Sequence, residues 1–270
     1  MKIVSFNING LNAALNNGKF DRLINETKPD ILCLQEIKMQ QNKLNEFVEK
    51  YPEWIIISSI NSVKRGYAGV STLISKEKCK EFNYIQSFIP EEIITEDIDP
   101  AYGNGRVIVS EFKDFYLINS YTMNSGAKMI KRVQYDQNLL KLLKSLNKPY
   151  ILCGDLNVCS TYKDFWGNYE KSRNTYPGLM DFEIFHFEDA YINEEKLIDI
   201  YRKQYPESRE YTWFSNPRRK GIKTPHETNH GWRLDYFLIK PELEKYVKET
   251  KIFFNFQEID HEPILLDICI

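Results

Sequence analysis

Acid, amide and imidazole side chains border several apolar runs of this chain of 270 residues, at points where strands are expected to begin or end. Asp260 and His261 precede the last such run, Glu36 follows an early one, and Asp155 and Asn157 follow a third. A carboxylate at the end of a buried strand loses its hydration unless it pairs with a cation, and Mg²⁺ prefers one or two carboxylates plus waters. If these strand ends converge, the residue types predict a metal-assisted site for phosphodiester cleavage.

Each of these side chains has a definite part in such chemistry. Asp155 and Asn157 are two apart on an extended segment, so they point to the same side and can orient a water for in-line attack on phosphorus. His261 can hold or release a proton near neutral pH. Asp235 lies within an otherwise apolar strand, and we expect it to pair with an imidazole, fixing its tautomer and favouring its protonated form.

Structural alternatives stand beside these functional interpretations. Glu36 is equally well explained as a helix-capping or ion-paired acid, and Asp155 with Asn157 as part of a turn. Trp213 and Trp232 either line a slot for a flat or apolar ligand group or belong to the core. Surface or structural roles are favoured for the other histidines, which are His186, His226 and His230.

The order of apolar runs predicts one α/β domain over residues 1–270, because the chain has no internal repeat and no linker rich in glycine, serine or proline. Mixed hairpins and helical crossovers predict two mixed β-sheets packed face to face and flanked by helices. Strands are predicted at 3–7, 31–34, 55–60, 68–74, 106–112, 115–121, 150–153, 211–214, 233–239, 252–256 and 264–268. Helical spacing marks 20–24, 139–146 and 197–201, and 163–187 is predicted to be mostly loop.

Composition narrows the class of protein. With 42% hydrophobic and 14% aromatic residues the chain can bury a sizeable core, and no apolar run approaches the roughly 20 residues needed to cross a bilayer. Strand-like sequence starts at once, so no signal peptide is expected. Five scattered cysteines without CxxC spacing favour reduced thiols and a cytoplasmic protein, with Cys33 and Cys153 in the core.

Local clusters of positive charge are the places where nucleic acid would bind, because the net charge of the whole chain is only −2. The main cluster lies within 218–223 and begins with Arg218 and Arg219, which we expect to contact phosphates. Lys64 and Arg65 form a smaller cluster. The alternative for both clusters is a set of solvated loop charges.

A series of short motifs runs through nearly the whole chain in a fixed order. They are Ser-Phe-Asn-Ile-Asn-Gly-Leu (5–11), Leu-Gln-Glu-Ile-Lys (34–38), Gly-Tyr-Ala-Gly-Val (66–70), Gly-Arg-Val-Ile (105–108), Gly-Asp-Leu-Asn-Val (154–158), Tyr-Thr-Trp-Phe-Ser (211–215), Gly-Trp-Arg-Leu-Asp-Tyr (231–236) and Asp-His-Glu-Pro-Ile (260–264). Jointly they are specific, and the chain resembles the exonuclease III family of apurinic/apyrimidinic endonucleases.

The resemblance implies a four-layer α/β sandwich and an enzyme of base-excision repair that depends on Mg²⁺, with Mn²⁺ as the alternative metal. Such an enzyme cleaves the DNA backbone 5′ to an abasic site, often with 3′–5′ exonuclease or 3′-phosphodiesterase activity. The implied partner is double-stranded DNA with abasic or 3′-blocked lesions. A monomer that binds no membrane is expected.

The resemblance also implies roles for individual residues. Asp155 would align or deprotonate the attacking water, and His261 would bind or protonate the scissile phosphate oxygens. The wider assignment is metal binding by Glu36, Asn9 and Asp260, catalysis by Asp155, Asn157, His261, Asp235 and Tyr121, and substrate binding by Asn7, Asn124, Asn174, Trp213, Trp232 and Leu234. The last three would form a pocket for a flipped-out, base-free sugar.

Several positions depart from the family pattern. The segment 174–179 does not match the usual Phe-Thr/Leu-Pro-x-Glu-Arg stretch, and Thr122, Met123, Ile259 and Glu262 replace the usual residues at their positions. These changes bear on DNA grip and lesion preference rather than on the chemistry.

Two alternatives to abasic-site cleavage therefore stay open. One is a related metal phosphodiesterase acting on undamaged DNA, messenger tails, inositol phosphates or sphingomyelin. The other is a DNA-binding module without catalysis, against which the retained acids and imidazole speak, because a retired site has no need of such groups.

Overall fold

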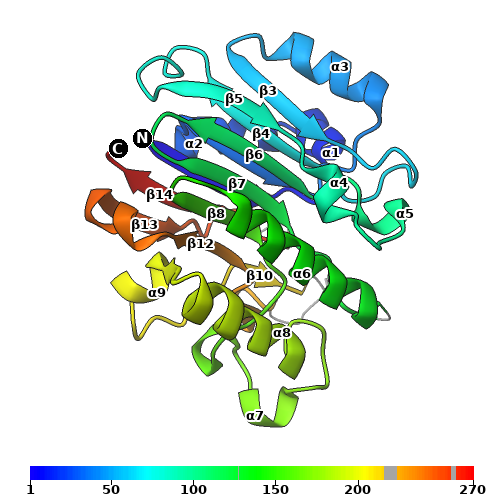
Figure 1. Cartoon of the computed structure of the whole chain (residues 1–270), viewed down its shortest axis with the longest axis vertical. Coiled ribbons are helices and arrows are strands. Elements are labelled where there is room, and N and C mark those ends of the chain that lie inside the picture. The colour runs from blue at the N-terminus through cyan, green and yellow to red at the C-terminus, as the bar shows by residue number, and fades with distance from the viewer. Residues whose placement is uncertain (127, 216–223, 257–259) are drawn as a thin grey trace.

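Two six-stranded sheets form the centre of the computed structural model, which describes the chain apart from Ala127 and residues 216–223 and 257–259 (Figure 1). The first sheet has the order β13-β14-β1-β2-β4-β3, built from β1 (Lys2–Asn7), β2 (Ile31–Gln35), β3 (Trp54–Ser59), β4 (Val70–Ser75), β13 (Val247–Ile252) and β14 (Ile264–Ile268). The second has the order β5-β6-β7-β8-β12-β9, built from β5 (Tyr84–Phe88), β6 (Val107–Phe112), β7 (Tyr116–Tyr121), β8 (Tyr150–Asp155), β9 (Ile198–Asp199) and β12 (Asp235–Ile239). The strands β10 (Trp213–Phe214) and β11 (Gly231–Trp232) form a separate pair.

Helices cover the outer face of each sheet. The first sheet is covered by α1 (Leu11–Asn16), α2 (Lys19–Thr27) and α3 (Gln41–Lys50). The second is covered by α6 (Met129–Ser145), α8 (Asp181–His186) and the π-helix η2 (Phe187–Glu194). Shorter helices are α4 (Glu91–Ile94), α5 (Pro100–Gly103), η1 (Tyr162–Asp164), α7 (Tyr169–Ser172), α9 (Ile200–Gln204) and η3 (Pro241–Tyr246). The predicted sandwich of two mixed sheets between helices is confirmed.

Alternation along the strands explains the layers. In β2, Leu32 and Leu34 face the helices of the first sheet, whereas Ile31 and Cys33 face the second sheet. Cys153 on β8 lies in the same layer between the sheets, so both cysteines are core residues as predicted. Because both faces of the central strands are buried, these strands read as continuous apolar runs.

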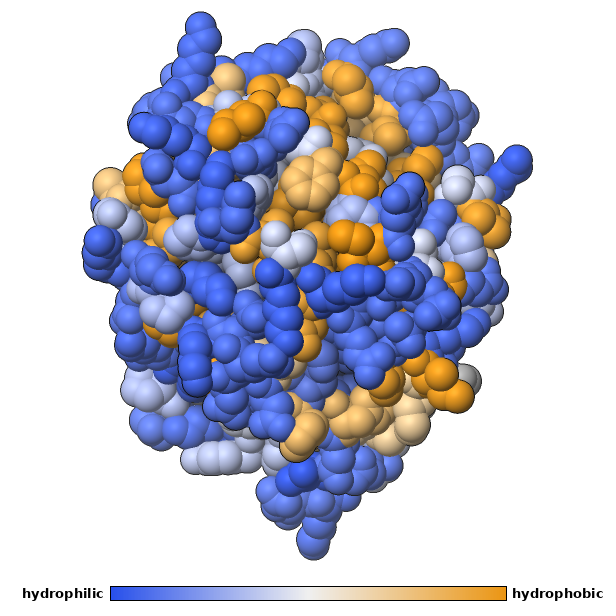
Figure 2. Space-filling model, in the orientation of Figure 1, coloured by the Kyte–Doolittle hydropathy of each residue, from blue (hydrophilic) through white to orange (hydrophobic). Residues whose placement is uncertain are grey.

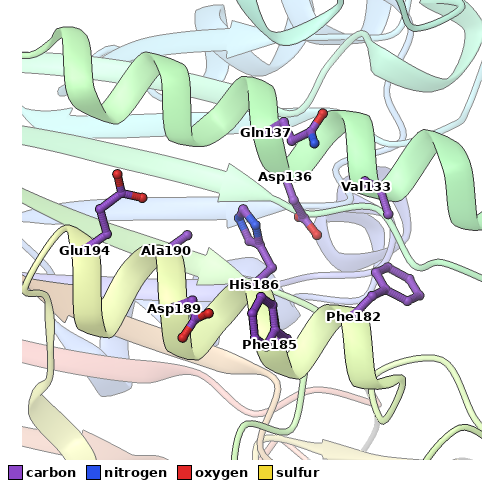
Figure 3. A pocket seen from close by; sticks show the side chains of 9 residues that line it. All are labelled: Val133, Asp136, Gln137, Phe182, Phe185, His186, Asp189, Ala190 and Glu194. Atoms are coloured by element: carbon purple, nitrogen blue, oxygen red, sulfur yellow. The ribbon is translucent and has the colours of Figure 1, made fainter.

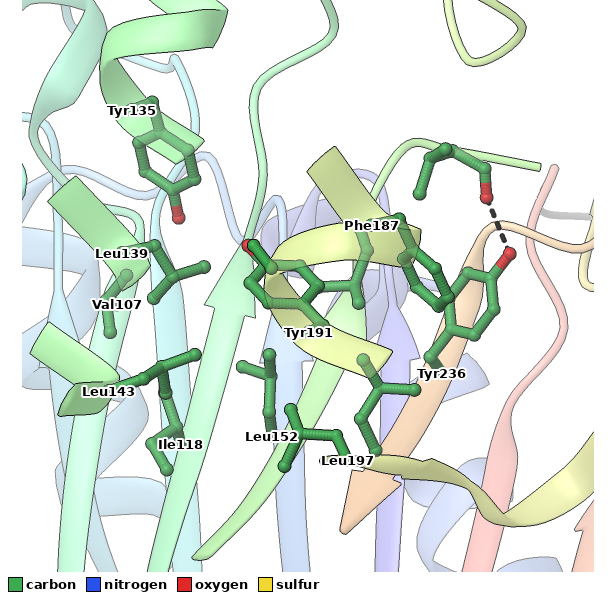
Figure 4. Close-up of a cluster of buried hydrophobic side chains, with 14 of the residues drawn as sticks. Val107, Ile118, Tyr135, Leu139, Leu143, Leu152, Phe187, Tyr191, Leu197 and Tyr236 are labelled. Carbon is green, nitrogen blue, oxygen red and sulfur yellow. Dashed lines mark hydrogen bonds between the residues drawn. The ribbon is translucent and has the colours of Figure 1, made fainter. Parts of the chain in front are cut away.

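The third core layer packs α6 and η2 against the second sheet (Figure 4). Leu139 and Leu143 on α6 lie over Ile118 of β7 in this cluster. The Tyr236 hydroxyl donates to the Val158 carbonyl over 2.6 Å, which ties β12 to the segment that follows β8. No described helix is long and apolar enough to cross a membrane.

Some predicted elements differ from the structure. The segment 163–187 is not mostly loop, because it contains α7, α8 and part of η1. Their short length, with helices of 4 and 6 residues for α7 and α8, left no readable period. A strand was predicted at 252–256, but the strand found there, β13, spans Val247–Ile252 and so ends where the predicted strand begins. The helix predicted at 197–201 is β9 followed by α9. Three further elements, α1, α3 and β5, were not predicted from the sequence.

Strand direction brings the polar strand ends to one edge of the sandwich. β1 and β2 are parallel with Asn7 opposite Gln35, and β7 and β8 are parallel with Tyr121 opposite Asp155. β12 runs antiparallel to β8 and begins with Asp235 opposite Asp155. Parallel strands end at the same edge, and an antiparallel neighbour starts there. The candidate site residues are therefore neighbours because of the sheet topology.

Gly154 shows how closely the strands approach at this edge. Its φ is 129°, and a Cβ at this position would lie 1.9 Å from the backbone oxygen of Ser120 on β7. We expect Gly154→Ala to lower the free energy of unfolding by about 3 kcal/mol or more, because a backbone atom cannot move aside as a side chain can. Urea denaturation measures this loss.

The matched control for that variant is Gly18→Ala. Gly18 has a φ of 75° but no heavy atom within 4 Å of its ideal Cβ. This control reports the strain of a positive φ without a clash, on the order of 1 kcal/mol. Equal losses for the two variants would show that the contact with β7 is unimportant.

Candidate active site

A pocket of about 340 Å³ opens at the edge where these strand ends meet. Its lining comes from chain segments far apart in the sequence, so it depends on the whole fold. The lining residues are Glu36, Tyr121, Asn124, Asp155, Asn157, Tyr176, Pro177, Trp213, Trp232, Leu234, Asp260 and His261. Most of the residues that the sequence singled out are brought together here.

Asp155 is the most enclosed acid of the pocket, with 1% of its surface exposed. Its Oδ2 accepts hydrogen bonds from Asn7 Nδ2 over 2.9 Å and from Asn157 Nδ2 over 3.2 Å. Its Oδ1 accepts from the Asn157 backbone N–H over 3.0 Å. Asn157 adopts a φ of 50° to make these contacts, a conformation that asparagine tolerates. The carboxylate is therefore held in one orientation.

His261 lies between two carboxylates. Its Nδ1 is 2.8 Å from Asp235 Oδ2, which confirms the predicted pairing, and its Nε2 is 3.8 Å from Asp155 Oδ2. Burial alone would lower the pKa of His261, but the Asp235 carboxylate outweighs it, and Asp155 and Asp260 add to it, so the pKa is about 10. The imidazole is thus charged near neutral pH, with Nε2 pointing toward the pocket acid.

Burial lowers the pKa of the imidazole but raises the pKa values of the acid and the phenol of the pocket. Burial raises the pKa of Asp155 to about 7. The charge of His261 lowers this pKa, and the Asp235 and Glu36 carboxylates raise it. Burial and the nearby Glu36 carboxylate also raise the pKa of Tyr121 well above its usual value. Tyr121 is therefore a neutral hydroxyl donor, and Asp155 sits close to the pKa that suits a general base near neutral pH.

Glu36 and its neighbours form the cation-binding side of the pocket. Glu36 follows β2 with a φ of 50°, which is rare for a residue of this type and aims its carboxylate at the strand ends. Its Oε1 accepts from Asn7 Nδ2 over 2.9 Å, and its Oε2 lies 2.6 Å from the Lys38 ammonium. Burial raises the pKa of Glu36, but Lys38 and the Asn7 amide outweigh it, and the pKa is lower than usual.

The donor set around Lys38 tests whether these residues fit a metal ion. The ammonium is 2.6 Å from Asn9 Oδ1 as well as 2.6 Å from Glu36 Oε2, and Asn9 Nδ2 donates to Asp260 Oδ1 over 2.9 Å. A positive charge is thus already held by two of the predicted ligand oxygens. Within the described residues no group of three or more His, Cys, Asp and Glu could hold a metal alone. A site with only a few carboxylates beside amide oxygens is suited to Mg²⁺, because Mg²⁺ keeps several of its waters when a protein binds it.

Aromatic side chains form another wall of the pocket. Trp213 and Trp232 meet edge to face with ring centroids 5.7 Å apart, and Tyr176 meets Trp232 in the same manner at 6.2 Å. Leu234 completes this wall. Trp213 also donates its indole N–H to Asp260 Oδ2 over 3.4 Å, which links the apolar wall to the predicted metal ligands.

Comparison with known proteins agrees with this arrangement. A model of the endonuclease/exonuclease/phosphatase family matches residues 4–255. The chain belongs to this family. It is 33% identical to an exodeoxyribonuclease of Bacillus subtilis over 100% of both chains, and 30% identical to the DNA repair nuclease APEX1 of Danio rerio over 100% of this chain and 83% of that one. A 3′ phosphatase from Neisseria bound to a product DNA hairpin has the same fold, with a TM-score of 0.81, 22% identity and full coverage of both chains.

Among the predicted site residues that the structure describes, Asn174 neither lines the pocket nor bonds a residue that does. Asn174 is exposed, and its side chain exchanges hydrogen bonds with Asp181 at the start of α8, over 2.7 Å and 2.9 Å. Asn174 thus has no described contact with the other site residues. Arg218 and Arg219 lie outside the described residues, so their predicted phosphate contacts stay predictions.

Other residues in and around this pocket were not predicted from the sequence to be part of the site. Tyr176 and Pro177 line the pocket from a segment without a readable period. Lys38 was visible only as the end of the Leu-Gln-Glu-Ile-Lys motif, two residues after Glu36. Arg106 was visible only within the Gly-Arg-Val-Ile motif, and its guanidinium lies 4.8 Å from the Tyr121 ring centroid and donates to the Tyr121 carbonyl over 3.1 Å.

Proposed function

We propose that this protein is a Mg²⁺-dependent DNA phosphodiesterase of base-excision repair that cleaves the backbone 5′ to abasic sites. A 3′–5′ exonuclease or 3′-phosphodiesterase activity at the same site is part of the proposal. The observation that carries it is the convergence of Glu36, Asp155 and the Asp235–His261 pair in one pocket with an aromatic wall. The nuclease relatives of the family support the substrate class.

The proposed chemistry divides among the residues of the pocket. Asp155, held by Asn7 and Asn157, orients the attacking water and accepts its proton. The charged His261 binds the phosphate oxygens or gives a proton to them, since its Nε2 faces the Asp155 side of the pocket. Tyr121 donates its hydroxyl to the same phosphate, with Asn124 beside it.

Glu36, Asn9 and Asp260 are the residues that would hold the metal ion. A bound Mg²⁺ neutralises charge on the phosphate, and Mn²⁺ accepts the same oxygen ligands. Glu36 is suited to this task because its pKa is lower than usual and it stays ionised.

The aromatic wall supports selection of a base-free sugar. A nucleotide without a base has little stacking to lose when it leaves the helix, so it enters a pocket at low energetic cost. Apolar side chains, those of Trp213, Trp232 and Leu234, enclose part of the pocket. A sugar ring without a base can fill this space, whereas an intact nucleotide would have to push these side chains aside.

A second candidate keeps the chemistry and changes the substrate to a 3′-blocked DNA end or undamaged DNA. Tyr176 and Pro177 favour this candidate, because they line the pocket from the segment in which the sequence departs from the family pattern. A neighbour with this fold is a 3′ phosphatase.

A nicking assay on a duplex with one abasic site, with and without Mg²⁺, tests the proposal. Cleavage 5′ to the lesion in Mg²⁺ and none after chelation are expected. Matched duplexes that are undamaged or carry a 3′ phosphate give the relative rates. Equal rates on undamaged DNA would reject lesion specificity, and a faster rate on the 3′ phosphate would favour the second candidate. No cleavage of any duplex would leave a phosphodiesterase for a substrate other than DNA, or a DNA-binding module.

The proposal also treats the protein as a monomer in the cytoplasm. All five cysteines are free thiols, which suits a reducing compartment. Gel filtration tests the oligomeric state, and fractionation of cells tests the location.

Lysines that contact the Tyr67 and Tyr102 rings are expected to bind DNA phosphates. Lys64 Nζ lies 4.0 Å from the Tyr67 ring centroid, and Lys131 Nζ lies 3.5 Å from that of Tyr102. Among the described residues neither lysine forms an ion pair. Replacing Lys64 and Lys131 together with Ala should weaken binding and make the slope of log affinity against log salt shallower by roughly 2, since two phosphate contacts are lost.

Lys141→Ala is the control for this measurement, because Lys141 lies farther along α6 and pairs with Glu96 over 2.5 Å. Its salt slope should equal that of the unmodified protein. An unchanged slope in the double variant would exclude the two lysines from the DNA interface.

A further inference from the structure

One arginine outside the pocket contacts two of the loops that form it. Arg132 lies on α6 with 2% of its surface exposed. Its Nη1 donates to the carbonyls of Met123 over 2.9 Å and Asn157 over 3.3 Å, and its Nη2 donates to the carbonyl of Leu156 over 3.1 Å. These carbonyls belong to the segment that leads from Tyr121 to α6 and to the segment that follows Asp155.

A third pocket segment is connected through an acid. Arg132 Nη1 lies 3.3 Å from Glu183 Oε1 near the start of α8. The other oxygen, Glu183 Oε2, accepts the backbone N–H groups of Gly178 over 2.7 Å and Met180 over 3.1 Å. These groups directly follow Tyr176 and Pro177, the lining residues that the sequence did not reveal. One guanidinium thus connects all three loops on this side of the pocket.

Asp136 supplies the second negative charge for Arg132. Both of its carboxylate oxygens accept from Arg132 Nε, over 2.9 Å and 2.8 Å. Figure 3 shows Asp136 on α6 facing α8, on the wall of a separate cavity of about 320 Å³ that His186 and Phe182 also line. Arg132 Nε thus bonds an acid that lines this cavity, whereas Nη1 and Nη2 bond carbonyls of the pocket loops.

Only arginine can make this set of contacts. A guanidinium holds five N–H donors in a rigid planar fork, whereas a lysine ammonium is a single point that can reach only some of the same oxygens. The buried charge is matched by Asp136 and Glu183, so the geometry is fixed by charge as well as by hydrogen bonds.

We propose that Arg132, acting with Asp136 and Glu183, is a positioning residue that aligns the Asp155–Asn157, Met123–Asn124 and Tyr176–Pro177 segments for phosphodiester cleavage. The inference rests on the proposed function for its kinetic part. Displacing catalytic groups by about 1 Å can lower a rate 10²-fold without abolishing binding. Because Arg132 does not line the pocket, its loss should act on kcat more than on KM.

Arg132→Lys is the main test, and Tyr150→Phe is its matched control. Tyr150 begins the same strand β8 at its opposite end, with its buried hydroxyl donating to Glu195 Oε2 over 2.6 Å. Both variants lose buried polar contacts of the second sheet. We expect Arg132→Lys to lower kcat for abasic cleavage by about 10- to 100-fold with KM changed less than about 3-fold. Tyr150→Phe should leave both constants near their original values.

Hydrogen exchange followed by mass spectrometry gives a readout that needs no substrate. Peptides covering 122–126, 156–158 and 176–180 should exchange faster in Arg132→Lys and not in Tyr150→Phe. If the protein failed to cut abasic DNA, the proposed function would fall while this measurement would still decide the positioning role. Glu183→Gln is the second variant, for the case that Arg132→Lys does not fold. It should loosen 176–180 and leave 122–126 protected.

A double variant separates positioning from a general loss of stability. If Arg132 acts by aiming Asn157, Arg132→Lys should have little further effect on kcat in an Asn157→Ala background. Unchanged exchange in all three loops, or a kcat loss that multiplies fully with that of Asn157→Ala, would overturn the proposal. A kcat of Arg132→Lys within 2-fold of the original at full folding would overturn it as well.

Discussion

Asp155→Asn is expected to lower the single-turnover rate of abasic-site cleavage by about 10³-fold while the protein stays folded and binds DNA. The reason is both chemical and geometric. An amide cannot accept a proton from the attacking water. It would also direct N–H groups at donors, because both Asp155 oxygens accept hydrogen bonds from Asn7 or Asn157. Quenched-flow cleavage of an end-labelled duplex measures the rate, and fluorescence anisotropy measures the affinity.

Asp114→Asn is the matched control for this experiment. Asp114 is exposed in the turn between β6 and β7, where the same chemical change meets no catalytic group. Its cleavage rate should be unchanged. If Asp155→Asn retained a rate within 10-fold of the original, Asp155 would lose its assignment as the group that activates water.

Loss of the His261 imidazole should have the second large effect. We expect His261→Ala to reduce the cleavage rate by about 10³-fold and Asp235→Asn by about 10²-fold. The Asp235 carboxylate is 2.8 Å from Nδ1 and is a main cause of the pKa of about 10 that keeps the imidazole charged. His261 therefore contributes a positive charge at the phosphate, and Asp235 contributes by maintaining it.

The two replacements should not be additive. In the His261→Ala background, Asp235→Asn is expected to change the rate by less than about 3-fold, because the group through which it acts has gone. Rates of the four proteins in one double-mutant cycle check this. A full further 10²-fold loss would mean that Asp235 serves the reaction independently, for instance through its repulsion of Asp155.

Most of the fold and the acid, amide and imidazole residues of the site were predictable from the sequence. Buried strands such as β2 and β8 announce themselves as apolar runs, and the polar residues that follow them, Glu36 and Asp155, mark the edge where parallel strands end. The Asp235–His261 pair was predictable because an acid inside an apolar strand needs a partner.

The remaining parts depend on contacts that no local pattern encodes. Arg132 and Glu183 are 51 residues apart and lie on two different helices, α6 and α8. No local pattern in the sequence therefore predicts their contact. Tyr176 lines the pocket from the segment between α7 and α8, and helices as short as α7 have no measurable period. Asn174, predicted as the equivalent of a phosphate-binding amide in a segment that does not match the family pattern, instead bonds Asp181 at the start of α8.

The ammonium of Lys38 has a consequence for how the protein meets its metal. Lys38 bridges Glu36 and Asn9, and a divalent ion that uses the same oxygens has to displace it. Metal entry is then an exchange of one cation for another rather than the filling of bare negative charge. If Glu36 and Asn9 hold a metal ion, its apparent affinity measures the difference between two occupants of the same oxygens, the metal ion and the Lys38 ammonium.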